Sequence, residues 1–104
     1  MNNLPFFLQF TVRRRATPDQ DNQAHKALAT VIVFAANDVT ARSRAGRLIG
    51  ANLLEIESFD RIQRIHASRV PTLDKVLRDL FSKAEFFGGA LHLDFYPARP
   101  FDQR

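Results

Sequence analysis

The stretch ALATVIVFAA, residues 27–36, decides the fold of this chain. It is apolar at both odd and even positions, which is typical of a central strand covered on both faces or of a buried helix. The β-branched side chains at positions 30–33 favour the strand, because branching at Cβ restricts χ1 in a helix and packs well on a pleated sheet. We therefore predict a buried strand here.

An alternating segment, residues 6–15, precedes this run. Its apolar face consists of Phe6, Leu8, Phe10 and Val12. Its polar face consists of Gln9, Thr11, Arg13 and Arg15, and Phe7 interrupts it. Period-two alternation predicts a strand with one face in water. The turn-rich segment ATPDQDNQ, residues 16–23, predicts a loop between the two strands.

Two helices are expected after the central strand. Asn37 and Asp38 offer an N-cap for a helix over residues 39–51, with Asn52 as its left-handed C-terminal stop. The inward face of this helix consists of Ala41, Ala45, Leu48, Ile49 and Asn52. A second helix is predicted from Pro71-Thr72 to Gly88-Gly89. Its amphipathic stripe consists of Leu73, Val76, Leu77, Leu80, Ala84 and Phe87.

Two further strands complete the pattern. Residues 53–65 alternate with a break in phase, which predicts one long strand with a bulge or two strands joined near residues 58–60. Leu91, Leu93 and Phe95 alternate with polar or aromatic neighbours and predict a last strand. The tail from Pro97 contains two prolines and is expected to be irregular.

These elements predict an α+β domain with the order β-β-α-β-α-β. We expect a small two-layer sandwich in which two helices cover one face of a mixed four- or five-stranded sheet, as in a ferredoxin-like fold or a permuted relative. The 104 residues suit a single domain, residues 1–104, with one hydrophobic core and an irregular tail at residues 97–104.

Composition narrows the classes of function. Hydrophobic residues make up 45% of the chain and charged residues 25%, which are ordinary globular values, so wholesale disorder is not expected. The absence of cysteine excludes disulfides, thiolate zinc sites and thiol catalysis, and it fits a reducing compartment. No segment has the pattern of a secretory signal or of a membrane span, so we predict a cytoplasmic protein without a membrane partner.

The aromatic residues suggest a contact surface. Of ten phenylalanines, the pattern directs Phe6, Phe10, Phe34, Phe87 and Phe95 inward and leaves Phe7, Phe86 and Phe101 outside. Ser43, Gly46 and Gly50 add a stripe of small residues on the outer side of the first helix, where another backbone could approach. Aromatic residues are enriched in the cores of protein interfaces. We predict a non-catalytic protein-protein interaction or assembly module that self-associates, with a homodimer as its simplest form.

The basic residues support an alternative function. The chain has 15 lysines and arginines against 11 acidic residues, a net charge of +4. Arginine suits phosphate because its planar fork donates two parallel hydrogen bonds. A nucleic-acid-binding domain, for RNA or DNA, is therefore the alternative if the clustered arginines share one face. These are Arg13, Arg14, Arg15, Arg42, Arg44, Arg47, Arg61 and Arg64.

Catalytic and metal chemistry have little support in the sequence. His25, His66 and His92 are far apart and form no ligand motif, and no glycine-rich phosphate loop is present. We therefore predict no enzyme activity, no metal, no cofactor and no small-molecule ligand. A third option, an enzyme subunit completed by a partner, would need a pocket that brings His92 and Asp94 against His66.

Overall fold

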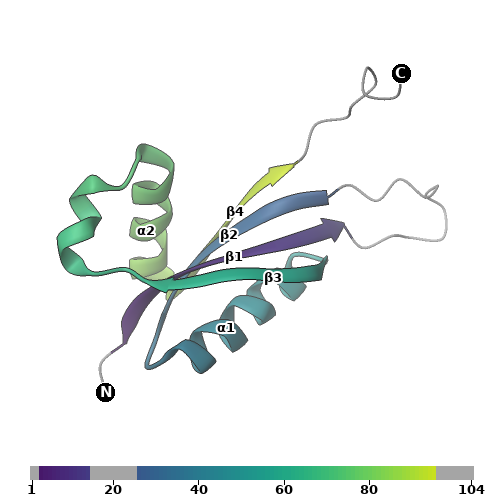
Figure 1. Ribbon diagram of the computed structural model, residues 1–104, viewed down its shortest axis with the longest axis horizontal. Coiled ribbons are helices and arrows are strands. Elements are labelled where there is room, and N and C mark those ends of the chain that lie inside the picture. The colour runs from purple at the N-terminus through teal and green to yellow at the C-terminus, as the bar shows by residue number, and fades with distance from the viewer. Residues whose placement is uncertain (1–2, 15–25, 96–104) are drawn as a thin grey trace.

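The computed structural model describes residues 3–14 and 26–95, so the predicted loop at 16–23 and the predicted tail lie outside the described residues. The α+β class and the predicted order of strands and helices are confirmed (Figure 1). The elements are β1 (Leu4–Arg14), β2 (Lys26–Ala35), α1 (Asp38–Ala51), β3 (Leu54–Arg64), the 3₁₀-helix η1 (Ala67–Thr72), α2 (Lys75–Phe87) and β4 (Gly89–Phe95).

The four strands form one sheet in the order β3-β1-β2-β4, and each neighbouring pair is antiparallel. The prediction of a mixed sheet is therefore wrong. The connection through α1 leads from β2 to β3, two strands that run in the same direction, but β1 lies between them and pairs antiparallel with both. β3 and β4 are the two edge strands.

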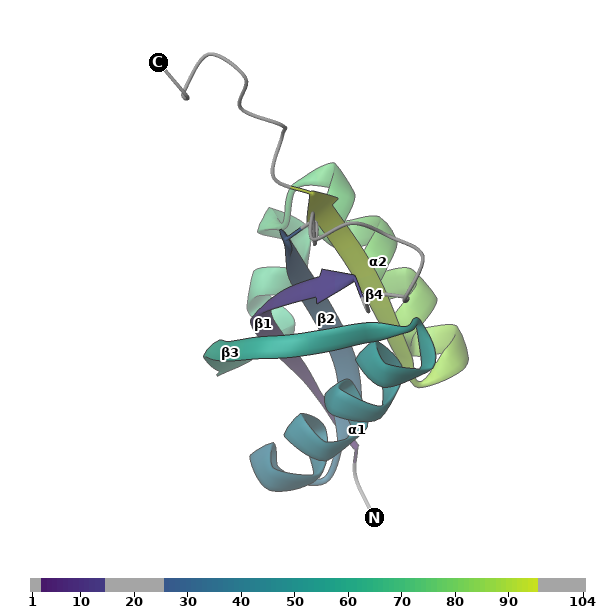
Figure 2. The ribbon, with the colours of Figure 1, turned by 90° about the vertical axis from the view of Figure 1, so that its right-hand side faces the viewer.

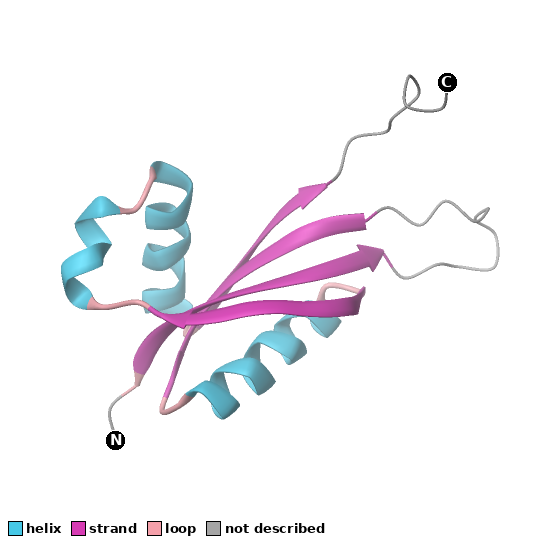
Figure 3. Cartoon of the chain, in the orientation of Figure 1, coloured by secondary structure: helices cyan, strands magenta, loops and turns pink. Residues whose placement is uncertain are grey.

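The helices cover opposite faces of the sheet (Figures 2 and 3). Successive side chains of a strand point to opposite faces. In β2, Val31 and Val33 belong to the same cluster as Ile49 of α1, whereas Ile32 lies in the cluster of α2. The prediction that both helices cover one face, as in a ferredoxin-like sandwich, is wrong in this respect. The physical reason is the run at 27–36, which is apolar on both faces and so requires cover on both.

Two cores result from this arrangement. The α1-side core joins β1, β2 and α1, and it includes Leu8 and Val12, which are fully buried. The α2-side core consists of buried Ile32, Ile65, Leu80, Phe81, Ala84 and Ala90, with Phe7, Phe34, Val70, Leu73 and Leu77 packed against it. Phe34 meets Phe81 edge to face, with ring centroids 5.5 Å apart. Burial on both faces is the main stabilising contribution to this sheet.

The helix α1 has the predicted N-cap and ends at Ala51 as predicted, but the conformation of its C-terminal cap differs from the prediction. Asn37 is the N-cap, and its side-chain oxygen accepts a hydrogen bond from the Thr40 amide at 2.8 Å. Asn52 is not left-handed, with φ −96°; Leu53 takes that conformation instead, with φ 61°. The Asn52 side chain donates to the Leu48 carbonyl at 2.8 Å, so it satisfies the end of the helix without the left-handed turn.

The segment after α1 is one strand, β3, and the alternative of two joined strands is excluded. Its pairing with β1 shifts twice, between Gln9 and Phe10 and between Thr11 and Val12. These irregularities explain the break in alternation near Phe59. They also twist an exposed edge, which disfavours pairing with another chain.

The second helix is shorter than its pattern predicted. It begins at Lys75, where the Asp74 side chain accepts from the Leu77 amide at 2.9 Å, and Pro71 belongs to η1. Phe81, which the predicted stripe omitted, is buried, and Phe87, which the stripe included, is 74% exposed. The face of α2 that packs on the sheet carries Leu77, Leu80, Phe81 and Ala84. Phe87 lies at the side of this face and is therefore exposed.

Gly88 is expected to be required at the end of α2. It has φ 91° and closes the helix with an amide that donates to the Ala84 carbonyl at 2.7 Å. A Cβ at Gly88 would meet nothing within 4 Å, so Gly88→Ala should cost about 1–2 kcal/mol through backbone strain alone. Urea unfolding followed by circular dichroism measures this loss.

Gly46→Ala is the matched control and should have the opposite sign. Gly46 lies inside α1, and a Cβ there also meets nothing within 4 Å. Alanine is the better helix former by about 1 kcal/mol, so the variant should be more stable than the parent. A Gly88→Ala variant as stable as the parent would contradict the assigned helix end.

Candidate functional site

Two phenylalanine rings stand exposed at the C-terminal end of α2. Phe86 is 80% exposed and Phe87 is 74% exposed, and their rings meet edge to face with centroids 4.8 Å apart. The helix stops at Gly88, so no following turn covers them. The prediction that Phe86 faces outward agrees with this position, and the prediction that Phe87 faces inward is wrong.

A recess of about 430 Å³ lies beside Phe87, between the end of α2 and the α1 helix. The Phe34 amide donates to the Gly88 carbonyl at 3.0 Å, which ties this end of α2 to the sheet. Arg44 donates from its guanidinium to the Phe34 carbonyl. The recess is lined by Val33, Arg44, Arg47, Leu48, Phe87, Gly88 and Gly89. We call Phe86 and Phe87 together with this recess the α2-end surface.

The predicted stripe of small residues lies elsewhere on α1. Ser43 is exposed, and a Cβ added at Gly46 or Gly50 would meet nothing within 4 Å, so another backbone could approach there. At 100° per residue, Arg47, which itself lines the recess, lies between this stripe and Leu48. The stripe therefore adjoins the recess at Arg47, on the side away from Leu48.

Phe7 lies in a different place from Phe86. It is half-buried on the α2 side of the sheet, and the Arg61 guanidinium lies over its ring, 5.5 Å from the centroid. Leu77, near the start of α2, lies close to Phe7, whereas Phe86 is at the opposite end of that helix. Phe101 lies outside the described residues.

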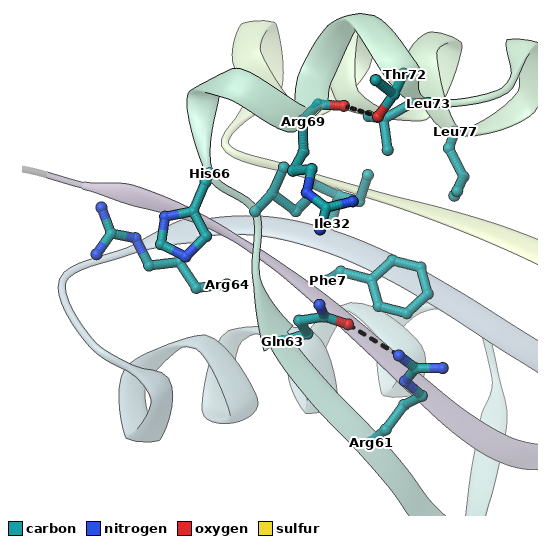
Figure 4. A pocket seen from close by; sticks show the side chains of 11 residues that line it. Phe7, Ile32, Arg61, Gln63, Arg64, His66, Arg69, Thr72, Leu73 and Leu77 are labelled. Carbon is teal, nitrogen blue, oxygen red and sulfur yellow. Dashed lines mark hydrogen bonds between the residues drawn. The ribbon is translucent and has the colours of Figure 1, made fainter.

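A pocket of about 280 Å³ forms between β1, β2, β3, η1 and α2 (Figure 4). Apolar side chains make one side of it, among them Phe7, Ile32, Leu73 and Leu77. Polar and basic side chains make the other side, namely Arg61, Gln63, Arg64, His66, Arg69 and Thr72. Among the described residues, no carboxylate lines this pocket. We call it the arginine pocket.

The candidate arginines occupy three separate places rather than one face. At one end of β1, Arg13 pairs with Glu55 at 3.2 Å, and Arg14 lies over the Phe95 ring, 5.1 Å from its centroid. On α1, Arg42 lies 4.0 Å from the Phe59 ring centroid. Arg44 and Arg47 line the recess, Arg61 and Arg64 line the arginine pocket, and Arg15 lies outside the described residues.

In the described part of the chain, His66 and His92 do not come together. His92 Nε2 lies 3.2 Å from Asp94 Oδ1 on the edge strand β4. His66 follows β3, the opposite edge of the sheet, so the pocket that a partner-completed enzyme would need is not formed. No group of three or more metal-ligating side chains occurs in the described part of the chain.

The sequence contained weak signals for both surfaces. Phe86 and Phe87 precede a Gly-Gly pair, which already placed them in the last turn of a helix that nothing continues. Arg69 belongs to the same basic cluster as Arg61 and Arg64, but its position across from Phe7 depends on η1, which the sequence did not predict.

No helix in residues 3–14 and 26–95 is long and apolar enough to cross a membrane. Comparison with protein families, curated proteins and solved structures finds no match to this chain.

Proposed function

We propose that this protein is a small, non-catalytic interaction module that self-associates through the α2-end surface. The observation that carries the proposal is the pair of adjacent phenylalanine rings, 80% and 74% exposed, at the end of α2. Single exposed apolar side chains are ordinary, but adjoining ones mark a contact surface. A cytoplasmic location, as the sequence predicts, belongs to the same proposal.

The energetics favour covering these rings. Full burial of a phenylalanine side chain contributes about 1.5–3 kcal/mol relative to exposure. In a symmetric dimer, Phe86 and Phe87 of both copies lose contact with water, so four rings contribute to association. That contribution is of the size that gives a hot spot at a protein interface.

The α2-end surface has both a projecting ring and a recess, so it can bind the same surface of a second copy. Phe86 projects from the helix, and the recess beside Phe87 provides apolar walls from Val33 and Leu48. Arg44 and Arg47 at the same recess can lie over an incoming aromatic ring. A two-fold interface requires that a projection on one copy meets a recess on the other, and vice versa. A second copy of the chain therefore satisfies the chemistry of this surface.

Size-exclusion chromatography with light scattering tests the proposal on the parent protein. We expect a mass that rises with concentration to twice that of one chain, because the contact is an equilibrium between copies. The dimer should persist at high salt, since apolar burial dominates it, and added nucleic acid should leave the mass unchanged.

A different result would exclude self-association through the α2-end surface. A protein that stays monomeric at all concentrations, and gains mass only when nucleic acid is added at low salt, would instead support the nucleic-acid-binding alternative. A dimer that dissociates at high salt would indicate contact through charged groups rather than through Phe86 and Phe87.

A further inference from the structure

The arginine pocket combines an apolar wall with a row of hydrogen-bond donors. Phe7 and Ile32 come from adjacent positions of β1 and β2, and Leu73 and Leu77 face them from the start of the α2 region. The pocket thus offers an aromatic ring and two aliphatic side chains, Leu73 and Leu77, to a ligand, and Ile32 is fully buried beneath them. Such walls, with a few convergent polar groups, are the usual make-up of small-molecule sites.

The cationic side of the pocket is held in place by backbone structure. Arg69 lies in η1, where its amide donates to the His66 carbonyl at 2.8 Å and its carbonyl accepts from the Thr72 hydroxyl at 2.6 Å. Figure 4 shows the Arg69 side chain directed toward Phe7, whereas the Arg64 guanidinium points away from it. Arg69 is thus the arginine best placed to meet a bound ligand.

Donors on the β3 side complete the arrangement. Arg61 donates to Gln63 Oε1 at 2.8 Å, and its guanidinium lies over the Phe7 ring, so both side chains are oriented along the same wall. Neither Arg61 nor Arg69 forms an ion pair with an acidic side chain of the described residues. Two guanidinium groups with free donors flank one aromatic surface.

We propose that the arginine pocket binds a small aromatic anion, a molecule with one flat ring and a phosphate or carboxylate group. The ring packs on Phe7, Leu73 and Leu77, and the anionic group accepts hydrogen bonds from Arg69 and Arg61. Guanidinium groups bind both anions bidentately, so aryl phosphates and aryl carboxylates of the same size are covered by one chemistry. A volume of about 280 Å³ suits one ring and its substituent rather than a polymer.

Phenyl phosphate is the probe that tests both halves of the site. In a two-dimensional ¹H–¹⁵N NMR titration at about 0.15 M salt, where remote charges are screened, it should bind with a dissociation constant on the order of 0.1–1 mM. The shifted amides should be those of Phe7, Gln63, Arg69, Leu73 and Leu77. Inorganic phosphate and phenol, which each carry half of the ligand, should bind about tenfold more weakly or worse.

Variants separate the pocket from general positive charge. Arg69→Gln should weaken phenyl phosphate binding about tenfold, because a charge-assisted hydrogen bond is lost, and Arg69→Lys should recover only part of it. Phe7→Leu should weaken phenyl phosphate more than inorganic phosphate. The matched control is Arg42→Gln, which removes the same charge on the α1 side of the sheet and should change binding less than twofold.

Four outcomes would overturn the proposal. Inorganic phosphate that binds as tightly as phenyl phosphate would indicate a surface anion site, and phenol that binds as tightly would indicate a plain apolar cavity. An equal loss in Arg42→Gln and Arg69→Gln would indicate diffuse charge. A short oligothymidylate that shifts the pocket amides while phenyl phosphate does not would assign the pocket to single-stranded nucleic acid. None of these outcomes depends on self-association.

Discussion

The substitution Ile32→Asp is expected to prevent the domain from folding. Ile32 is fully buried on the α2 side of the sheet, packed in the α2-side core. The variant loses about 1.5–3 kcal/mol of apolar burial and leaves a carboxylate without a partner in a dry site, which costs several kcal/mol more. Their sum approaches or exceeds the whole stability of a typical small domain, about 5–15 kcal/mol.

Ile56→Asp is the matched control for this result. Ile56 is also an isoleucine in a strand, but it is 45% exposed on the edge strand β3. Its replacement should cost only about 1 kcal/mol, half the burial of one side chain. Circular dichroism and NMR amide dispersion compare the two variants. A folded Ile32→Asp variant, no less stable than Ile56→Asp, would mean that α2 does not cover this face.

Loss of both exposed rings is expected to abolish self-association without unfolding the chain. The double variant Phe86→Asp, Phe87→Asp removes the apolar groups of the α2-end surface from both copies of the proposed dimer. Each ring at the centre of an interface contributes about 2 kcal/mol or more, so the dissociation constant should rise at least 100-fold. The free energy of unfolding should change by less than about 1 kcal/mol, because surface residues contribute little to it. Sedimentation equilibrium measures the first quantity and urea unfolding the second.

Val39→Asp distinguishes this surface from other exposed apolar positions. Val39 is 76% exposed in the first turn of α1, where an added carboxylate is favourable to the helix. It should leave the dimer intact. Association that survives in the double variant but fails in Val39→Asp would move the interface to the side of α1 that carries the small-residue stripe.

The fold was predictable from the sequence where a local pattern is compatible with only one structure. The alternation in β1 and the caps Asn37 and Gly88 are local, so the sequence located the strand and the ends of both helices to within a few residues. The run at 27–36 also indicated cover on both faces, but which helix covers which face depends on contacts between distant segments. The prediction that both helices cover one face of the sheet was therefore wrong, although the run at 27–36 indicated cover on both faces.

The two candidate surfaces were harder to predict because they depend on the phase of α2 and on η1. A shift of the α2 stripe by about one residue buries Phe81 and exposes Phe87, and seven apolar residues in that helix allowed either phase. The arginine pocket joins side chains from five elements, β1, β2, β3, η1 and α2. Its key pair, Phe7 and Arg69, is brought together by a 3₁₀-helix around Pro71 that no periodic pattern indicates.

Self-association through the α2 end is tested most directly by placing a spin label beside it. The chain has no cysteine, so Ser82→Cys, one turn before Phe86 and exposed, accepts a nitroxide at a single position. Labelled protein is mixed with unlabelled ¹⁵N protein, so that only contacts between copies broaden amide signals. We expect broadening at Arg44, Leu48, Gly88 and Gly89, around the recess. Absence of broadening, or broadening centred on Gly46 and Gly50, would contradict the account.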